Sequence, residues 1–274
     1  MELEPVVIHW FRRDLRLTDN HALYHAVRSG YKVQLLFIFD SQIIDELPQN
    51  DRRVSLIYNR IKQLNRQLDS YGVSIRIERG YPSQILEKIV TEQNVIAVYA
   101  NEDYEPYAIK RDSTIKKMME KKGVGFHLFT DHLIAHPSQI VKTDGKPYTV
   151  YTPWSRKWFE LLHNTELIDY TVENIQENLA LYSQPMPSIQ ALGFINTGEE
   201  HNETLPGIDV LEKYGQNRDF PASNATSHMS VSLRFGIIGI RQLLRHSVDF
   251  SPYVNELGWR EFYASVLWNF PHVA

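Results

Sequence analysis

The chain has 274 residues, of which 43% are hydrophobic and 23% charged, a composition typical of folded globular domains rather than of disordered or fibrous chains. It contains no cysteine, which excludes disulfides, thiolate metal sites and cysteine catalysis. The formal net charge of −4 excludes a uniformly basic nucleic-acid-binding protein, although a local basic groove on an acidic body is compatible with it. The sequence has no signal-peptide pattern and no apolar run long enough to span a membrane, so we expect a cytoplasmic protein without membrane contact, and a monomer.

The first 131 residues alternate between short apolar runs and amphipathic segments. Continuous apolar runs are typical of strands buried on both faces, whereas apolar residues at intervals of three and four indicate helices. The predicted strands are 6–11, 33–39, 73–77, 95–100 and 126–129, and the predicted helices between them are 19–29, 51–71, 82–90 and 106–122. This alternation predicts an α/β fold with a five-stranded parallel, Rossmann-like sheet and helices on both faces.

The pattern changes after Asp131. Few apolar runs follow, and residues 183–206 are rich in Pro, Gly, Ser and Asn, so we interpret 132–200 as a connector with one helix around 153–163. Helical signals return over 211–214, 230–244 and 255–270. The sequence therefore predicts an α/β domain over 1–131, a connector over 132–200 and a helical domain over 201–274.

Three arginines follow the first predicted strand: Arg12, Arg13 and Arg16. Ligands of parallel sheets bind beyond the carboxyl ends of the strands, so this cluster suits an anion or a carboxylate. The alternative is a solvated loop whose Arg–Asp pairs contribute little. The glycine-rich motifs that cradle a dinucleotide or a triphosphate are absent from the chain, and we predict no metal site.

Two further clusters lie in the last third of the chain. Thr226, Ser227 and Ser230 precede an apolar helical run, where unpaired N–H groups at a helix start suit a phosphate, or where one hydroxyl is an ordinary N-cap. The second cluster lies at helical spacing on one face and consists of Glu256, Trp259, Arg260 and Tyr263. Such a face is either a surface stripe with a Glu–Arg pair or a site that stacks an aromatic ring and hydrogen-bonds its polar edge.

Taken together, these segments resemble the photolyase/cryptochrome family. The segments that carry the resemblance are VVIHWFRRDLRLTDNHAL (6–23), NEDYEPYAIKRD (101–112), GKPYTVYTPW (145–154), YGQNRDFPASNATSHMS (214–230) and NELGWREFY (255–263). They occur in the family's order and span nearly the whole chain. The resemblance implies an N-terminal α/β domain, a long connector and the beginning of an all-helical FAD domain.

The resemblance also implies a function. DNA photolyases flip a pyrimidine dimer out of the duplex, and light drives an electron from reduced FAD to the dimer, which splits; this is a carbon–carbon lyase reaction. Glu256 matches the acid that hydrogen-bonds the damaged base, Trp259 matches the tryptophan near the lesion, and Arg218 matches a DNA-contacting arginine. The expected flavin-binding residues are Tyr214, Thr226, Ser227, His228, Met229, Ser230, Tyr253, Arg260 and Tyr263.

The sequence departs from the family pattern in two places that concern cofactors. His228 and Met229 replace usual members of the flavin phosphate loop. Tyr107 and Ala108 stand where members with a folate antenna carry an Asn-Glu pair, so an antenna of the folate type is not expected here. A deazaflavin, another flavin or no antenna remain open.

The sequence stops at Ala274, where family members continue into the rest of the helical domain. We therefore expect the 274 residues alone not to repair DNA and to bind FAD weakly or not at all. We also expect four apolar side chains to be more exposed than in a finished core: Leu257, Phe262, Leu267 and Phe270. Two alternative functions are a cryptochrome-like blue-light photoreceptor and a non-catalytic α/β nucleotide-binding module.

Overall fold

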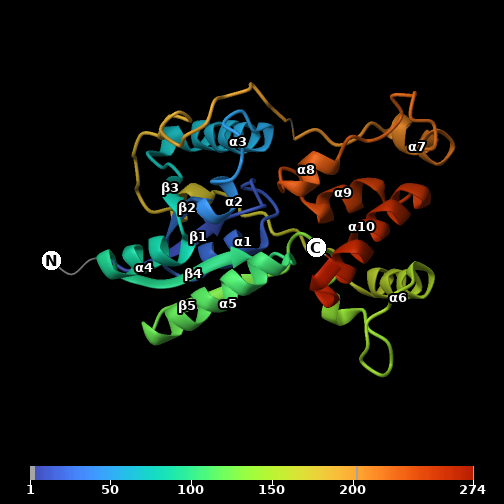
Figure 1. Cartoon of the computed structure of the whole chain (residues 1–274), viewed down its shortest axis with the longest axis horizontal. Coiled ribbons are helices and arrows are strands. Elements are labelled where there is room, and N and C mark those ends of the chain that lie inside the picture. The colour runs from blue at the N-terminus through green and yellow to red at the C-terminus, as the bar shows by residue number, and fades with distance from the viewer. Residues whose placement is uncertain (1–3, 202, 274) are drawn as a thin grey trace.

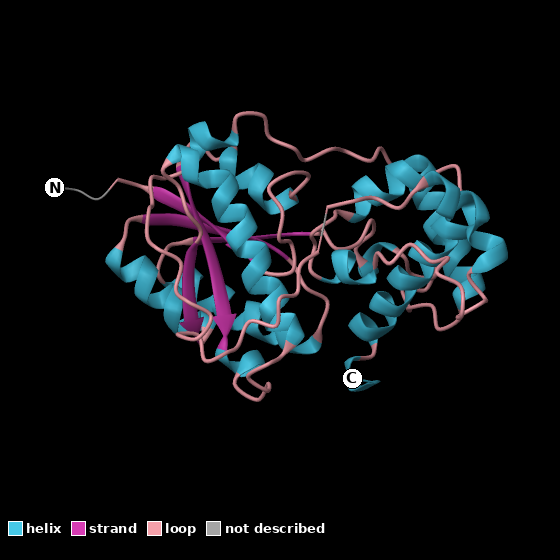
Figure 2. Ribbon diagram, turned by 90° about the horizontal axis from the view of Figure 1, so that it is seen from above, coloured by secondary structure: helices cyan, strands magenta, loops and turns pink. Residues whose placement is uncertain are grey.

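The computed structural model describes residues 4–201 and 203–273. An α/β part and an all-helical part lie side by side, joined by stretches of connecting chain (Figures 1 and 2). The pattern change after Asp131 therefore coincides with a change of architecture, because the chain leaves the last strand just before that residue.

The α/β part is built on one parallel sheet of five strands. The strands are β1 (Val6–Phe11), β2 (Lys32–Asp40), β3 (Arg76–Gly80), β4 (Val95–Asn101) and β5 (Gly125–Phe129). Their order across the sheet is β3-β2-β1-β4-β5, and every neighbouring pair is parallel. The order reverses between β1 and β4, which places the crevice typical of such sheets at the carboxyl ends of these two strands.

Helices cover both faces of the sheet, which confirms the predicted α/β class. On one face α1 (His21–Val27) and α3 (Arg52–Leu68) share an apolar core with the strands. On the other face α4 (Pro82–Glu92) and α5 (Pro106–Lys121) form a second core. The short α2 (Ser41–Ile44) follows β2 directly.

The third strand begins later than its hydrophobic pattern predicts. Residues 73–77 are the predicted strand, whereas β3 pairs with β2 only from Arg76 onward. Val73 instead bridges Tyr182 of the connector, and the Ser74 N–H donates to the Tyr182 carbonyl at 2.7 Å. The first residues of the predicted strand therefore pair with a connector segment more than a hundred residues later in the sequence, and not with β2.

The connector contributes to both parts of the molecule. Its helix α6 (Tyr151–Asn164) packs in the helical part, with Trp154 and Trp158 fully buried. The chain then returns along the α/β part, where Leu179 and Phe194 join the core beside α3. Individual apolar residues of the connector are thus buried in the two cores, although its composition is typical of a loop.

The last third of the chain is helical, as predicted. It contains α7 (Ile208–Asn217), α8 (Ser230–Arg234), α9 (Ile240–Ser247) and α10 (Ser251–Asn269), followed by a short 3₁₀ turn at Pro271–Val273. Earlier in the chain, short 3₁₀ turns lie at Asp69–Tyr71, Pro137–Gln139 and Ile175–Asn178. None of the helices in the described residues is both long and apolar enough to cross a membrane.

The predicted helix over 230–244 is wrong, because the structure breaks it at Gly236. This residue has φ +61°, and a Cβ there would lie 2.1 Å from the Arg13 carbonyl oxygen. The Leu15 N–H donates to the Phe235 carbonyl at 3.1 Å in the same contact. The helix ends here because the chain must approach the loop after β1 at backbone distance.

The expected exposure of α10 is also wrong for two of the four apolar residues. Leu257 is 5% and Phe262 is 6% exposed. Both belong to a core that α6 and α9 complete, and Trp154 packs edge-on against Phe262. The connector helix supplies the packing partners that the expectation left out, while Leu267 and Phe270 are half-buried.

Candidate functional site

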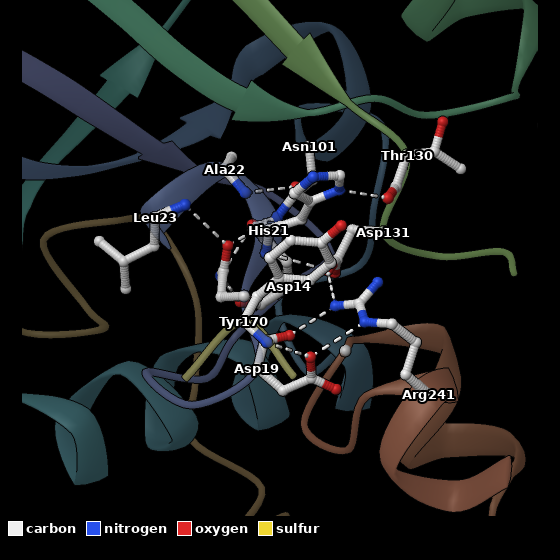
Figure 3. A network of polar contacts seen from close by, with 12 residues as sticks. Asp14, Asp19, His21, Ala22, Leu23, Asn101, Thr130, Asp131, Tyr170 and Arg241 are labelled. Atoms are coloured by element: carbon white, nitrogen blue, oxygen red, sulfur yellow. Dashed lines mark hydrogen bonds and ion pairs between the residues drawn. The ribbon is translucent and has the colours of Figure 1, made fainter. Parts of the chain in front are cut away.

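A buried ionic network joins the carboxyl end of the sheet to the helical part (Figure 3). Both carboxylate oxygens of Asp131 accept hydrogen bonds from Arg16, at 2.8 and 2.7 Å, and one also accepts from Arg241 of α9 at 2.7 Å. Asp19 accepts from the Arg241 Nε at 2.9 Å. Although burial opposes ionisation, the two guanidinium groups hold the pKa of Asp131 well below its usual range. The network therefore fixes α9 against the sheet with paired buried charges.

The other two arginines after β1 are also paired within the chain. Arg12 donates to Asp112 of α5 at 2.5 Å, and Arg13 donates to Asp103 at 2.9 Å and Glu105 at 3.0 Å. The Arg12–Asp112 and Arg13–Asp103 pairs are largely shielded from solvent, whereas the Glu105 side chain is 35% exposed. The structure thus matches neither sequence-based alternative, because the arginines form a buried internal network instead of an anion site or a solvated loop.

An open pocket of about 430 Å³ lies in the helical part. Its walls come from α7, the segment before α8, and α10. The lining residues are Tyr214, Arg218, Asp219, Thr226, Glu256, Trp259 and Tyr263. All but Asp219 are among the residues that the sequence predicts, and they converge from segments up to 49 residues apart in the chain.

One helical face supplies three of these residues. Glu256, Trp259 and Tyr263 of α10 all line the pocket, as the helical spacing predicts. Arg260 departs from this face, because its Nη1 donates to the His132 carbonyl oxygen at 2.7 Å, on the side of the α/β part. The structure therefore separates Arg260 from the other predicted residues of this face.

Glu256 is paired across the pocket with Arg218. The Arg218 Nη1 donates to the Glu256 Oε1, and this bond raises the pKa of the guanidinium further. Both side chains are 34% exposed, so water and a ligand can reach the pair. A ligand N–H that bonds to Glu256 must share its carboxylate with Arg218 or displace it.

The predicted phosphate loop lies at a helix start, as expected. Residues 226–229 are irregular, and α8 begins at Ser230. Among the described residues, no group of the chain accepts a hydrogen bond from the backbone N–H groups of 226–229. Since Thr226 lines the pocket, this segment offers unpaired donors beside it.

Tyr253 of α10 contacts this loop through a hydrogen bond to Ser227. Its hydroxyl donates to the Ser227 Oγ at 2.9 Å, and its ring meets that of Tyr214 edge-on at 4.9 Å. Tyr253 is only 3% exposed, and burial raises its pKa to about 12. The structure therefore places Tyr253 under the pocket wall and not among the lining residues.

The two residues that depart from the usual loop sequence take different positions. His228 adopts φ +53°, and its Nε2 lies 2.6 Å from the Asn224 side-chain oxygen. Met229 is half-buried against the helical core. Neither side chain lines the pocket, so in this region the backbone is the feature that can serve a ligand.

Two residues predicted to bear on an antenna pigment lie at the start of α5. The Tyr107 hydroxyl donates to Asp40 at 2.6 Å, and burial together with Asp40 raises the pKa of the tyrosine. Ala108 is buried, at 3% exposure. Both positions are thus occupied by contacts within the α/β part.

Comparison with known proteins places the chain in a family. The model of the DNA photolyase family matches residues 7–172, which is more than half of the sequence. The chain belongs to the DNA photolyase family. The predicted family resemblance is thereby confirmed.

Individual relatives agree with this assignment. The chain is 30% identical to a deoxyribodipyrimidine photo-lyase of Synechococcus sp. (strain PCC 6301), over 98% of this chain and 61% of the relative. It is also 30% identical to an uncharacterized 31.6 kDa protein of Synechococcus sp. (strain PCC 6716), over 94% of this chain and 99% of that protein. The solved photolyase of Sulfolobus tokodaii is 26% identical with a TM-score of 0.78, over 97% of this chain and 60% of that chain. The chain thus spans about 60% of the length of the photolyases it matches.

Proposed function

We propose that the pocket between α7, the 226–230 loop and α10 forms one wall of a site for FAD and pyrimidine-dimer DNA that serves the light-driven splitting of cyclobutane pyrimidine dimers; the weak or absent FAD binding expected of residues 1–274 by themselves stays a prediction. The observation that carries the proposal is the convergence of a carboxylate, an indole and unpaired backbone donors on one pocket, in a chain of the photolyase family. The matched relative named deoxyribodipyrimidine photo-lyase supports the same activity.

The residues present fit a flavin dinucleotide. The unpaired N–H groups of 226–229 suit the oxygens of a pyrophosphate. Ser227, whose hydroxyl accepts from Tyr253, and Ser230, the first residue of α8, belong to the same segment but are not among the residues that line the pocket. Tyr214 offers an aromatic wall next to this loop. When bound and reduced, the flavin supplies the light-driven electron, and the protein supplies binding and orientation.

The lesion side of the pocket is formed by α10. Trp259 presents a ring for stacking a base that has left the duplex, and such stacking is worth about 1–3 kcal/mol per base. The Glu256 carboxylate accepts hydrogen bonds from the ring N–H of a pyrimidine and so orients it. Arg218, freed from Glu256, can turn to a backbone phosphate.

We further propose that any antenna pigment of this chain is not a folate. Tyr107 is engaged with Asp40, and Ala108 offers no polar side chain. The Sulfolobus tokodaii photolyase was solved with two FAD molecules, which implied a novel light-harvesting cofactor, so a second flavin is one candidate antenna for this chain.

The flavin part of the proposal is tested by retention of FAD. The purified chain is loaded with FAD, and its dissociation constant is measured from the absorption and fluorescence of the flavin. Each lost hydrogen bond to a charged group costs about 1.5–3 kcal/mol, so loss of both bonds in the double variant Ser227→Ala/Ser230→Ala should weaken FAD binding at least about a hundredfold. The exposed serines of Ser70→Ala/Ser113→Ala provide the matched control. Equal affinity of both double variants would show that the hydroxyls of Ser227 and Ser230 do not hold the phosphates.

A cryptochrome-like photoreceptor is the alternative that the fold also permits. The presence of Glu256 and Trp259 together on the pocket favours the photolyase, because both groups serve recognition of a base. Preference for dimer-containing over undamaged DNA separates the two functions.

A further inference from the structure

The connector helix α6 contacts a residue that lines the pocket without lining the pocket itself. Its first residue, Tyr151, stacks on Trp259 of α10 with ring centroids 3.6 Å apart and planes 10° from parallel. Trp259 lines the pocket and Tyr151 does not. Tyr151 therefore covers the face of the indole that points away from the pocket.

The phenol of Tyr151 is held at a fixed place. Its hydroxyl lies 2.9 Å from the Asn255 carbonyl oxygen and 2.7 Å from the Asn255 side-chain oxygen. Both acceptors belong to α10, the helix that carries Trp259. Burial and the charge of Glu256 raise the pKa of Tyr151 to about 12, so the hydroxyl keeps its proton and remains a donor at neutral pH.

The sequence of α10 makes room for this ring. A Cβ at Gly258 would lie 2.9 Å from the Tyr151 Oη, and 3.4 Å from the nearest ring atoms of Trp158. Gly258 is in mid-helix, where glycine costs about 1 kcal/mol relative to alanine. The close approach of α6 explains why glycine stands there.

Helix α6 is itself anchored firmly. The Trp158 indole is fully buried, and its Nε1 donates to the Glu261 carboxylate at 2.8 Å. Glu261 also accepts from the Ile134 N–H at 2.5 Å and the Ala135 N–H at 3.3 Å. Tyr151 is thus mounted on a helix that a buried hydrogen-bond network locks to α10.

We propose that Tyr151 is a positioning residue that covers one face of the Trp259 indole, so that a ligand ring can stack only on the opposite face; the other aromatic neighbour at the pocket is Tyr263, whose ring centroid lies 5.7 Å from that of the indole at 28°. The inference rests on the proposed function for the nature of the stacked ring. The geometry that carries it is the stack and the space at Gly258.

The first test measures how accessible the Trp259 indole is. Three of the five tryptophans, Trp10, Trp154 and Trp158, are buried, so a Trp268→Phe background leaves Trp259 as the one indole that acrylamide can reach. In that background Tyr151→Leu should raise the acrylamide quenching constant, because the covered face opens. Tyr151→Phe keeps the ring and should match the parent. Phe159→Leu removes another half-buried aromatic ring of α6 and should also match it.

A second pair of variants distinguishes loss of the Tyr151 contact from general misfolding, because the second change should reverse the effect of the first. Gly258→Ala places a Cβ against the Tyr151 hydroxyl and should raise quenching, as Tyr151→Leu does. Adding Tyr151→Phe to Gly258→Ala removes that oxygen and should restore low quenching. If Tyr151→Leu and Gly258→Ala leave quenching at the parent value, Tyr151 does not shield Trp259 and the proposal is overturned.

The last test asks whether this position matters for a ligand. Aromatic pairs contribute about 0.5–1.5 kcal/mol, so Tyr151→Leu should weaken binding of a single-dimer oligonucleotide by about two- to tenfold, with Tyr151→Phe and Phe159→Leu unchanged. Undamaged oligonucleotide should bind all variants equally. If the parent itself shows no preference for the dimer, the proposed function fails, and the quenching data still decide the role of Tyr151. A preference that Tyr151→Leu leaves intact would overturn the positioning role alone.

Discussion

The ionic network around Asp131 predicts a large loss of stability when its central carboxylate is neutralised. Asp131 is 1% exposed and accepts three hydrogen bonds from two arginines, Arg16 and Arg241, that are themselves buried. Asp131→Asn keeps the shape but leaves two buried cations short of a counter-charge. Breaking a buried pair in this way costs about 3–5 kcal/mol.

Urea unfolding followed by circular dichroism measures this effect. With a urea dependence of about 3 kcal/mol per molar, at the upper end of the range for small proteins, the midpoint of Asp131→Asn should fall by about 1–2 M. Asp144→Asn is the matched control, because Asp144 is 53% exposed and meets Lys146 at 3.5 Å. Its effect should stay within about 0.5 kcal/mol. Equal midpoints for the two variants would refute the reasoning.

The same network predicts a pH dependence. The folded protein holds the pKa of Asp131 below its unfolded value of about 3.9. The stabilisation by Asp131 is therefore fully present above that pH and is lost as the pH falls toward the folded-state pKa. The difference in free energy of unfolding between wild type and Asp131→Asn should accordingly be constant near neutrality and shrink below about pH 4. A difference that stays constant down to pH 2 would contradict the role of the carboxylate charge.

Two further predictions concern the contact after β1 and the sheet core. Gly236→Ala should lower the urea midpoint far more than Gly145→Ala, because both glycines have positive φ but only Gly236 faces a backbone atom, the Arg13 oxygen; similar midpoints would contradict the close contact. Burial lowers the pKa of His9 from 6.5 to about 3, so the unfolded chain binds a proton there that the folded chain does not, and stability should fall as the pH drops from 6.5 toward 3. In His9→Leu the slope of unfolding free energy against pH over this window should be flatter, and an unchanged slope would exclude His9 as its source.

The sequence predicts the sheet and its helices well because their signals are local. Continuous apolar runs and helical periodicity each depend on neighbours within one element. The start of β3 could not be predicted from local signals, because Val73 pairs with Tyr182 of the connector. The break at Gly236 does so too, because its cause is the Arg13 backbone, more than two hundred residues earlier in the chain.

The residues of the candidate site also fall into those that local spacing predicts and those that it does not. Helical spacing correctly brings Glu256, Trp259 and Tyr263 to one pocket, but Arg260 turns to the His132 carbonyl, which spacing alone does not reveal. Tyr151 carries no signal in its own segment that relates it to Trp259. Gly258, an unusual residue in mid-helix, is the one local hint that another ring approaches there.

The central claim, that α10 presents a lesion-binding wall, is tested most directly by a binding competition with FAD-loaded protein. Dimer-containing and undamaged oligonucleotides of the same sequence are titrated against wild type, Trp259→Leu and Trp268→Leu. Wild type and Trp268→Leu should prefer the dimer, because Trp268 lies on the same helix but outside the pocket. Trp259→Leu should lose that preference, because base stacking contributes about 1–3 kcal/mol. Equal preference for the dimer in Trp259→Leu and wild type would contradict the account.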